Sequence, residues 1–293
     1  MKILSLFDGI SCARIALERA GIPVELYLAS EVDEYATRIS KKNWPDIVQL
    51  GDVRNVLDVG FGIHFIEKYG EIDLLIGGSP CQDLSIARRA RSGLHGEKSV
   101  LFWEYLRIWN EVQPKYFILE NVASMSDLDR DTISNALSTE PIMIDAALVS
   151  AQNRKRLFWT NIHVSIPEDR GIVLKDIVDE FALRRWIEPK NLHKTKNGVR
   201  WDTSGKGYFS QNDRAYSILG KHPTVPTART ITKVKVLFED GKIGILNWNE
   251  IERLQSLPDG YTDLPGENKL EKRGGCIGNG FNVEVITHIL RAI

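Results

Sequence analysis

The sequence predicts an α/β protein whose main domain is a doubly wound, mostly parallel sheet, joined to a smaller second domain. Short apolar runs that end at Gly, Pro or acidic residues alternate with segments whose apolar residues recur at helical spacing. This alternation is typical of βαβ units. After about residue 165 it stops and Lys and Arg accumulate. A chain of 293 residues with 43% hydrophobic content is long enough for one large and one small domain.

The strands of the main sheet are predicted in order through the first 160 residues. The first, 2–7, leads through a glycine turn into a helix that Gly21 and Pro23 end. The following strands are predicted at 26–30, 47–50, 72–76, 116–119, 146–149 and 157–160. Helices are predicted over 100–112, over 249–257 with a cap near Asn247, and over 283–293.

Polar residues stand at the ends of four of these strands: Glu31, Asp52, Cys81 and Glu120. The carboxyl ends of parallel strands meet at one edge of a sheet, and open α/β folds bind their ligands there. Glu31 follows the turn at Gly9 at about the distance where dinucleotide folds place a ribose-binding acid. Because the turn lacks a complete Gly-x-Gly-x-x-Gly, a nucleoside without phosphate fits it better than a dinucleotide.

Cys81 follows an apolar run and a Gly-Gly-Ser-Pro turn, which suits an exposed nucleophile at the sheet edge. A buried structural cysteine is the alternative. The cysteines are three in number and lack metal-ligand spacing. We therefore expect a reducing compartment, without disulfides or a bound metal. The short apolar start and the lack of a membrane-length run predict a cytoplasmic protein that does not contact membranes.

Charge is distributed unevenly along the chain, although the net charge is only −1. The window 184–235 holds 12 Lys or Arg against 3 acidic residues, a charge of +9, so the remainder carries −10. Such a basic segment on an acidic body predicts binding to a polyanion. A solvated basic face without a partner is the alternative.

Several short motifs, taken together, resemble those of the DNA (cytosine-5) methyltransferases and follow the order of that family. Some segments, such as Leu-Ser-Leu-Phe-Asp-Gly-Ile near the start, are similar to the catalytic domains of the animal de novo enzymes. The motifs are Phe7-Asp8-Gly9, Glu31, Gly51-Asp52, Ser79-Pro80-Cys81-Gln82, Glu120-Asn121-Val122, Gln152-x-Arg154-x-Arg156, Arg229-Thr230, Leu254-x-x-Leu257-Pro258 and Gly278-Asn279-Gly280.

The resemblance implies a Rossmann-like, class I methyltransferase fold and transfer of a methyl group from S-adenosylmethionine to C5 of cytosine, leaving S-adenosylhomocysteine. It implies that the Cys81 thiolate adds to C6 of the base and that Glu120 donates a proton to N3. Arg154 would hold the base O2, with Arg156 in support. Because C5 and C6 are inaccessible in stacked DNA, the base has to be flipped out.

The resemblance also assigns cofactor and DNA contacts. The predicted cofactor residues are Phe7, Asp8, Gly9, Ile10, Glu31, Val32, Asp52, Val53, Ser79, Pro80, Leu101, Asn279 and Gly280. The predicted DNA contacts are Ser85, Arg88, Arg89, Arg91, Gln152, Lys194, Lys196, Arg200, Arg229 and Thr230. Residues 1–164 and 239–293 would form the catalytic, cofactor-binding domain, and 165–238 the target-recognition domain.

A stand-alone bacterial or phage enzyme acting on double-stranded DNA is the leading interpretation. A cognate endonuclease of a restriction-modification system is a candidate partner, and we expect a monomer or a weak homo-oligomer. Two alternatives stay open: a tRNA cytosine-5 methyltransferase on the same fold, and a catalytically silent DNA-binding accessory protein. The recognition sequence does not follow from these residues.

Overall fold

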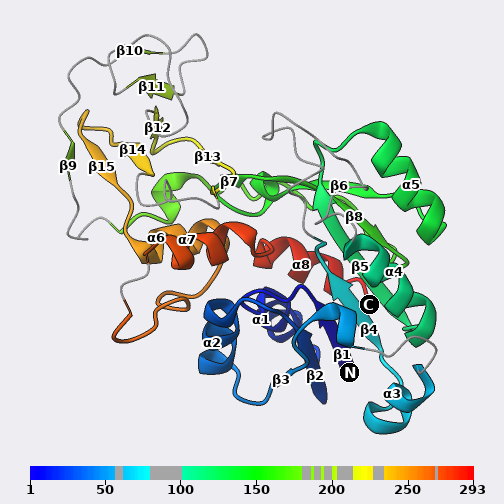
Figure 1. Cartoon of the computed structure of the whole chain (residues 1–293). Coiled ribbons are helices and arrows are strands. Elements are labelled where there is room, and N and C mark those ends of the chain that lie inside the picture. Colours follow the sequence, from blue (N-terminus) through cyan, green and yellow to red (C-terminus); the bar gives the residue numbers. More distant parts are fainter. Residues whose placement is uncertain are drawn as a thin grey trace. The chain divides into compact units, whose positions relative to one another are not determined.

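The computed structural model describes residues 1–56, 62–79, 101–179, 186–187, 193–194, 200–202, 214–226, 234–267 and 270–293. These residues form two compact units, whose elements are labelled in Figure 1. The first unit holds Met1–Asp145, Lys155–Ile166 and Val285–Ile293. The second holds Ala146–Arg154 and Pro167–Glu284.

The first unit is built on a seven-stranded sheet with the strand order β3-β2-β1-β4-β5-β8-β6. The strands from β3 to β5 pair in parallel, whereas β8 runs antiparallel to both of its neighbours. In sheet order the strands are β3 (Val48–Gln49), β2 (Leu26–Ser30), β1 (Lys2–Leu6), β4 (Leu74–Gly77), β5 (Tyr116–Val122), β8 (Lys155–Thr160) and β6 (Ile142–Asp145). The predicted α/β fold with a mostly parallel sheet is confirmed.

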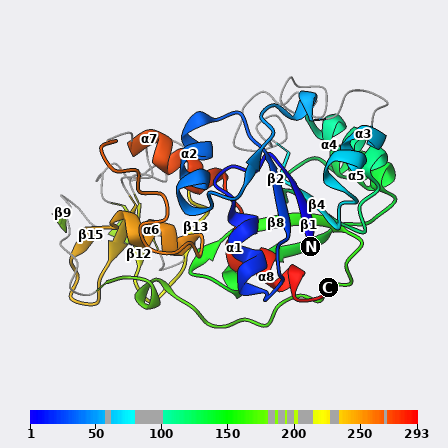
Figure 2. The same cartoon turned by 90° about the horizontal axis from the view of Figure 1, so that it is seen from below.

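Helices cover both faces of this sheet. In sequence order they are α1 (Cys12–Arg19), α2 (Glu34–Asn43), η1 (Val53–Asn55), α3 (Gly62–Tyr69), α4 (Leu101–Val112), α5 (Asp127–Leu137) and α8 (Val283–Leu290). The buried core that contains Leu4, Leu6 and Leu75 joins alternate strand residues to α3, α4 and α5. Figure 2 shows α3, α4 and α5 on one side of the strands and α1 and α8 on the other, as doubly wound folds require.

The turn at Gly21 ends α1 as the sequence predicts. Gly21 has a left-handed φ of 73° and donates its N–H to the Glu18 carbonyl, while Ile22 donates to Leu17. This pair of hydrogen bonds is the Schellman arrangement, in which glycine is favoured because it has no Cβ. The loop that follows returns the chain to β2.

Two expectations about the sheet need correction. The predicted strand 146–149 is wrong: η3 (Ala146–Leu148) is a 3-10 turn, and the strand is β6, just before it. The reason is pairing, because Ile142 and Asp145 lie opposite Phe158 and Lys155 of β8. Strand β5 also extends beyond its predicted end, because its pairing with β8 continues to Val122.

The second unit contains a six-stranded sheet, ordered β10-β11-β12-β14-β15-β9, whose strands are two to four residues long. These strands are β10 (His193–Lys194), β11 (Arg200–Asp202), β12 (Arg214–Ser217), β14 (Lys235–Leu237), β15 (Ile243–Ile245) and β9 (Trp186–Ile187). Besides η3, the other elements are β7 (Gln152–Asn153), η4 (Leu174–Asp176), β13 (His222–Pro223), α6 (Trp248–Leu254) and α7 (Leu270–Asn279). The short strands agree with the loop-rich character that the sequence predicts.

Helix α6 begins at the predicted cap, where the side chains of Asn247 and Glu250 each accept the other's backbone N–H. Helix α7 was not predicted, because Gly274, Gly275 and Gly278 lie within it and glycine disfavours helices. Arg273 helps to offset this cost, since its guanidinium binds the buried Glu252 at 3.1 Å.

The two units differ in extent from the predicted functional domains. The second unit includes 146–154 and 239–284 in addition to most of 165–238. Which of these residues recognise DNA is a functional question, so the division into catalytic and target-recognition domains stays a prediction. Among the helices of the described residues, none has both the length and the apolar character needed to cross a bilayer.

Candidate active site

The turn after β1 has an unusual backbone. Phe7, Gly9 and Ser11 have φ values of 56°, 61° and 60°, the left-handed region that only glycine adopts without strain. Each non-glycine residue held there costs roughly 1–3 kcal/mol and persists only where its surroundings impose it. Such strain concentrates at functional sites, which fits the predicted cofactor turn.

Asp8 lies inside this turn and is 6% exposed. Its two carboxyl oxygens accept hydrogen bonds from Tyr27 OH at 2.7 Å and from Ser11 Oγ at 2.5 Å. Burial raises the pKa of the Asp8 carboxyl above its ordinary value, and the donating hydroxyls act in the opposite direction. Ile10, two residues later, has a fully buried side chain. This side chain therefore offers no surface to a ligand outside the turn.

Glu31 follows β2 directly and lies beside the same turn. Its Oε2 accepts the Gly9 N–H at 2.8 Å, and its Oε1 accepts the N–H groups of Val32 and Asp33. These bonds fix the carboxylate at the carboxyl end of the sheet. Val32 beside it is 68% exposed, which leaves an apolar surface next to a carboxylate.

Asp52 follows β3, the neighbour of β2 in the sheet. Its carboxylate binds the Arg54 guanidinium, with Arg54 Nε 3.0 Å from Oδ1. The hydrogen bonds from Arg54 hold the pKa of Asp52 below its ordinary value. Val53 is buried, and Leu101 at the start of α4 is half-buried.

These carboxylates and apolar side chains fit S-adenosylmethionine. Carboxylates at the ends of two neighbouring strands can accept hydrogen bonds from ribose hydroxyls and an adenine amino group, as in other nucleoside-binding α/β folds. The half-buried Phe7 and the exposed Val32 offer apolar surface for a base. The turn also needs no phosphate loop, since this cofactor carries no phosphate.

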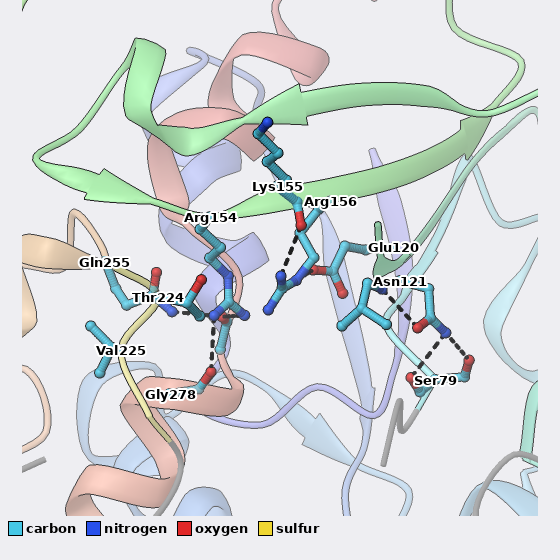
Figure 3. Close-up of polar contacts among 12 residues, drawn as sticks. Ser79, Glu120, Asn121, Arg154, Lys155, Arg156, Thr224, Val225, Gln255 and Gly278 are labelled. Carbon is cyan, nitrogen blue, oxygen red and sulfur yellow. Dashed lines mark hydrogen bonds and ion pairs between the residues drawn. The ribbon is translucent and has the colours of Figure 1, made fainter. Parts of the chain in front are cut away.

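Glu120 and Arg156 form an ion pair across strands β5 and β8 (Figure 3). Arg156 Nε lies 2.8 Å from Glu120 Oε1, and the two side chains are only 15% and 12% exposed. Glu120 lies opposite Phe158, so Arg156, two residues earlier on β8, is its diagonal neighbour on the same face. The Arg156 guanidinium also donates to the Lys155 carbonyl at 2.9 Å, so it is held from two directions.

Asn121 links the ends of β5 and β4. It is fully buried, and its Nδ2 lies 3.1 Å from Ser79 Oγ and 3.4 Å from the Ser79 carbonyl (Figure 3). Its Oδ1 accepts the Val122 N–H. Ser79 precedes Pro80 and Cys81 in the sequence. Asn121 therefore fixes the chain just before the predicted nucleophile, which lies outside the described residues.

Arg154 and Gln152 lie within the second unit and are buried. Arg154 donates to the carbonyls of Gly278 and Gly280 at 3.2 and 3.0 Å. Gln152 donates to the Leu254 carbonyl and accepts the Val225 N–H, both at 2.8 Å. The full burial of Gln152 does not fit its predicted contact with DNA, because its amide already bonds inside the unit.

A family model described as C-5 cytosine-specific DNA methylase matches residues 1–293. The chain belongs to this family. The type II methyltransferase M.FnuDI of Fusobacterium nucleatum is 37% identical over 341 residues, which cover all of this chain and 94% of that protein. The orphan methyltransferase M.SPRI of Bacillus phage SPR is 33% identical over 263 residues, or 80% of this chain. The chain spans only 58% of the length of M.SPRI.

Solved structures show the same fold. The Entamoeba histolytica methyltransferase EhMeth matches all of this chain and 97% of its own with a TM-score of 0.73, at 16% identity. At this identity the likeness concerns the fold alone. It agrees with the class I methyltransferase architecture of the C-5 cytosine methylase family.

The remaining predicted cofactor and DNA contacts lie in several parts of the chain. Asn279 is the exposed last residue of α7, and Gly280 follows it. Lys194 and Arg200 lie in β10 and β11. Residues outside the described ranges are Pro80, Cys81, Ser85, Arg88, Arg89, Arg91, Lys196, Arg229 and Thr230. Their assigned contacts stay predictions.

Some polar residues around the site were not predicted. Arg54 pairs with Asp52, Tyr27 donates to Asp8, and Gln255 bonds Gln152 and the carbonyls of Ile277 and Gly280. The pairing of Arg54 could have been predicted from the sequence, because Arg54 lies two residues after Asp52 and carries the opposite charge. The sequence contained no comparable signal for Tyr27 or Gln255, because their partners are distant along the chain.

Proposed function

We propose that this protein is an S-adenosylmethionine-dependent methyltransferase acting on C5 of cytosine in double-stranded DNA. The observation that carries the proposal is the largely buried Glu120–Arg156 pair on β5 and β8, next in sequence to the residue, Asn121, that bonds Ser79. This arrangement supports a role for Glu120 as an acid held beside the chain segment that leads to Cys81. Membership of the C-5 cytosine methylase family supports the same reaction.

In the proposed reaction the Cys81 thiolate forms a bond to C6 of a flipped-out cytosine while Glu120 gives a proton to N3. Arg156 binds one oxygen of Glu120 and so fixes the direction of the other oxygen. S-adenosylmethionine, when bound, supplies the methyl group that becomes attached to C5. A base then takes the C5 proton, the electron pair of the C5–H bond re-forms the C5–C6 double bond, and Cys81 leaves C6 as a thiolate. N3 returns its proton to Glu120, which restores the aromatic ring.

The two arginines of the Gln-x-Arg-x-Arg motif take different roles in this proposal. Arg156 is the arginine that acts at Glu120, because it is the one paired with that residue. Arg154 binds the carbonyls at the end of α7. The resemblance predicts that Arg154 holds the base with Arg156 in support, whereas this proposal gives the role at the site to Arg156. Glu31 and Asp52 would hold the cofactor nucleoside.

Methyl transfer from tritiated S-adenosylmethionine to duplex DNA and to tRNA tests the proposal. We expect label in DNA, and complete loss of transfer in Cys81→Ser with DNA and S-adenosylhomocysteine binding near those of the wild type. Cys276→Ser, on α7, is the matched control and should keep its activity. Label in tRNA alone would replace the DNA assignment. No transfer, together with no covalent trapping on 5-fluorocytosine DNA, would favour the accessory-protein alternative.

A further inference from the structure

A network of buried side chains lies beneath the turn after β1. We infer that Asp8 and Tyr27 are positioning residues that hold this turn in the shape that binds the cofactor, and that Asp8 does not itself contact the cofactor. This inference rests on the proposed cofactor, S-adenosylmethionine. It replaces the direct Asp8 contact expected from the family resemblance.

Asp8 differs from Glu31 and Asp52 in its burial, which keeps its hydrogen-bonded carboxyl out of reach of a ligand. One carboxyl oxygen accepts from Tyr27 OH and the other from Ser11 Oγ. Asp8 is 6% exposed, and Tyr27 is 1% exposed. The hydroxyl of Tyr27 is thus available to Asp8 but not to a molecule bound outside the turn.

The turn itself needs such an anchor. Asp8 lies between Phe7 and Ser11, two non-glycine residues with left-handed φ values, and such conformations persist only where neighbouring contacts impose them. Ser11 occupies the N-cap of α1, yet its side chain makes no cap hydrogen bond. Its hydroxyl is turned to Asp8 instead, although serine is a preferred N-cap residue.

The network extends under three neighbouring strands of the sheet. Ser11 Oγ lies 2.6 Å from Ser40 Oγ of α2, and Gln49 of β3 donates its Nε2 to Ser40 Oγ at 3.2 Å. Asp8 follows β1 and Tyr27 lies in β2. The three strands that these residues connect lead to the predicted cofactor residues Gly9, Glu31 and Asp52, so one buried network can set the spacing of all three.

Two substitutions separate positioning from direct contact. Tyr27→Phe removes a hydroxyl that no ligand can reach, so it weakens cofactor binding only if the network positions the turn. Asp8→Asn removes the charge but keeps the network, since the amide oxygen can accept from Tyr27 and the amide nitrogen can donate to Ser11. A direct bond to the cofactor's ammonium group would instead be weakened when the charge is removed.

The experiment is calorimetric titration of S-adenosylhomocysteine into the full chain and its variants, with thermal unfolding measured in parallel. We expect about tenfold weaker binding for Tyr27→Phe and a larger loss for Asp8→Ala, because each leaves buried polar groups without a partner. Asp8→Asn should bind within about twofold of the wild type. The matched control is Ser134→Ala, which loses a buried bond from Trp159 Nε1 at 3.0 Å. It should lower the unfolding temperature without changing the affinity.

Two outcomes would overturn this inference but leave the proposed cofactor standing. One is an unchanged affinity in Tyr27→Phe, and the other is an Asp8→Asn variant that binds as weakly as Asp8→Ala. A wild-type chain that does not bind S-adenosylhomocysteine would overturn the proposed cofactor, and this inference with it. Equal losses of affinity in the network variants and in Ser134→Ala would show that general stability, not the turn, is responsible.

Discussion

At the scale of single residues, the Glu120–Arg156 pair is the most specific chemical feature of the described residues. A carboxyl group and a guanidinium that are both largely buried interact more strongly than an exposed pair, whose net contribution is close to zero. Their diagonal position on β5 and β8 fixes both side chains on one face of the sheet. Such a pair acts as one unit.

We predict that Glu120→Gln and Arg156→Met each lower the rate of methyl transfer by about a hundredfold, the usual loss when a positioned acid is removed. The double variant should be little slower than the slower single variant, because residues that act together are not additive. Single-turnover methyl transfer measures the rates, and calorimetry should show unchanged S-adenosylhomocysteine binding.

Arg130→Met is the control for this cycle, because Arg130 forms ion pairs with Asp127 and Asp131 at the surface of α5 in the same unit. It should transfer methyl groups at the wild-type rate. Strictly additive losses in the Glu120 and Arg156 variants would show that the two residues act independently, contrary to the proposed roles.

At the scale of elements, the C-terminus of α7 illustrates how a buried cation stabilises a helix. The last carbonyls of a helix lack partners within the helix and carry a partial negative charge. Arg154 and Gln255 donate to the carbonyls of Ile277, Gly278 and Gly280. These bonds stabilise a helix whose glycine content would otherwise disfavour it.

Arg154→Met should therefore lower the free energy of unfolding by about 2–3 kcal/mol, because hydrogen bonds from a charged donor to buried acceptors are removed. Urea denaturation measures this change, and faster hydrogen exchange in α7 would locate it. Arg170→Met, which breaks an exposed pair with Glu284, should lose less than about 1 kcal/mol. Equal losses in the two variants would contradict the capping role.

Most elements of the first unit could be predicted from the sequence. Its strands are apolar runs with clear stops, and α1 and α4 have apolar residues at helical spacing, so local pattern and final structure agree. The strand expected at 146–149 lies at Ile142–Asp145 instead, because pairing with β8, which the local sequence does not reveal, decides its position. Helix α7 could not be predicted either. Its glycines favour a turn, and the contacts of Arg273 and Arg154 that stabilise the helix join residues distant in the sequence.

The site was predictable to the same extent. Acidic residues at strand ends identified Glu31, Asp52 and Glu120, because the ends of parallel strands must meet. Their partners did not follow from the sequence. Choosing between Arg154 and Arg156 as the partner of Glu120 requires the register of β8, and the hydroxyl of Tyr27 reaches Asp8 only because β1 and β2 are neighbours.

At the scale of the whole molecule, the uneven charge predicts how the protein responds to salt. The window 184–235 carries +9 on a chain whose net charge is −1. If about six of its cationic side chains bind phosphates, the affinity for duplex DNA should fall by about a thousandfold between 50 and 200 mM salt, because binding releases counterions. Fluorescence anisotropy with labelled duplex measures this dependence.

S-adenosylhomocysteine affinity, measured over the same salt range, is the control and should change little, since this small zwitterion carries no phosphate and releases no condensed counterions. A DNA affinity that is flat across the range would contradict the role of the basic window. Replacing Lys and Arg residues of the window one at a time should reduce the salt slope by about one for each phosphate that the variant no longer binds.

The boundary between the two units falls between Arg154 and Lys155, in the middle of the Gln-x-Arg-x-Arg motif. Each arginine bonds within its own unit. An engineer who builds chimeras with exchanged second units therefore has to transplant Ala146–Arg154 together with Pro167–Glu284 and leave Arg156 with the host. A simpler exchange that cuts only near residue 165 would set the end of a donor's α7 against an arginine from a different parent.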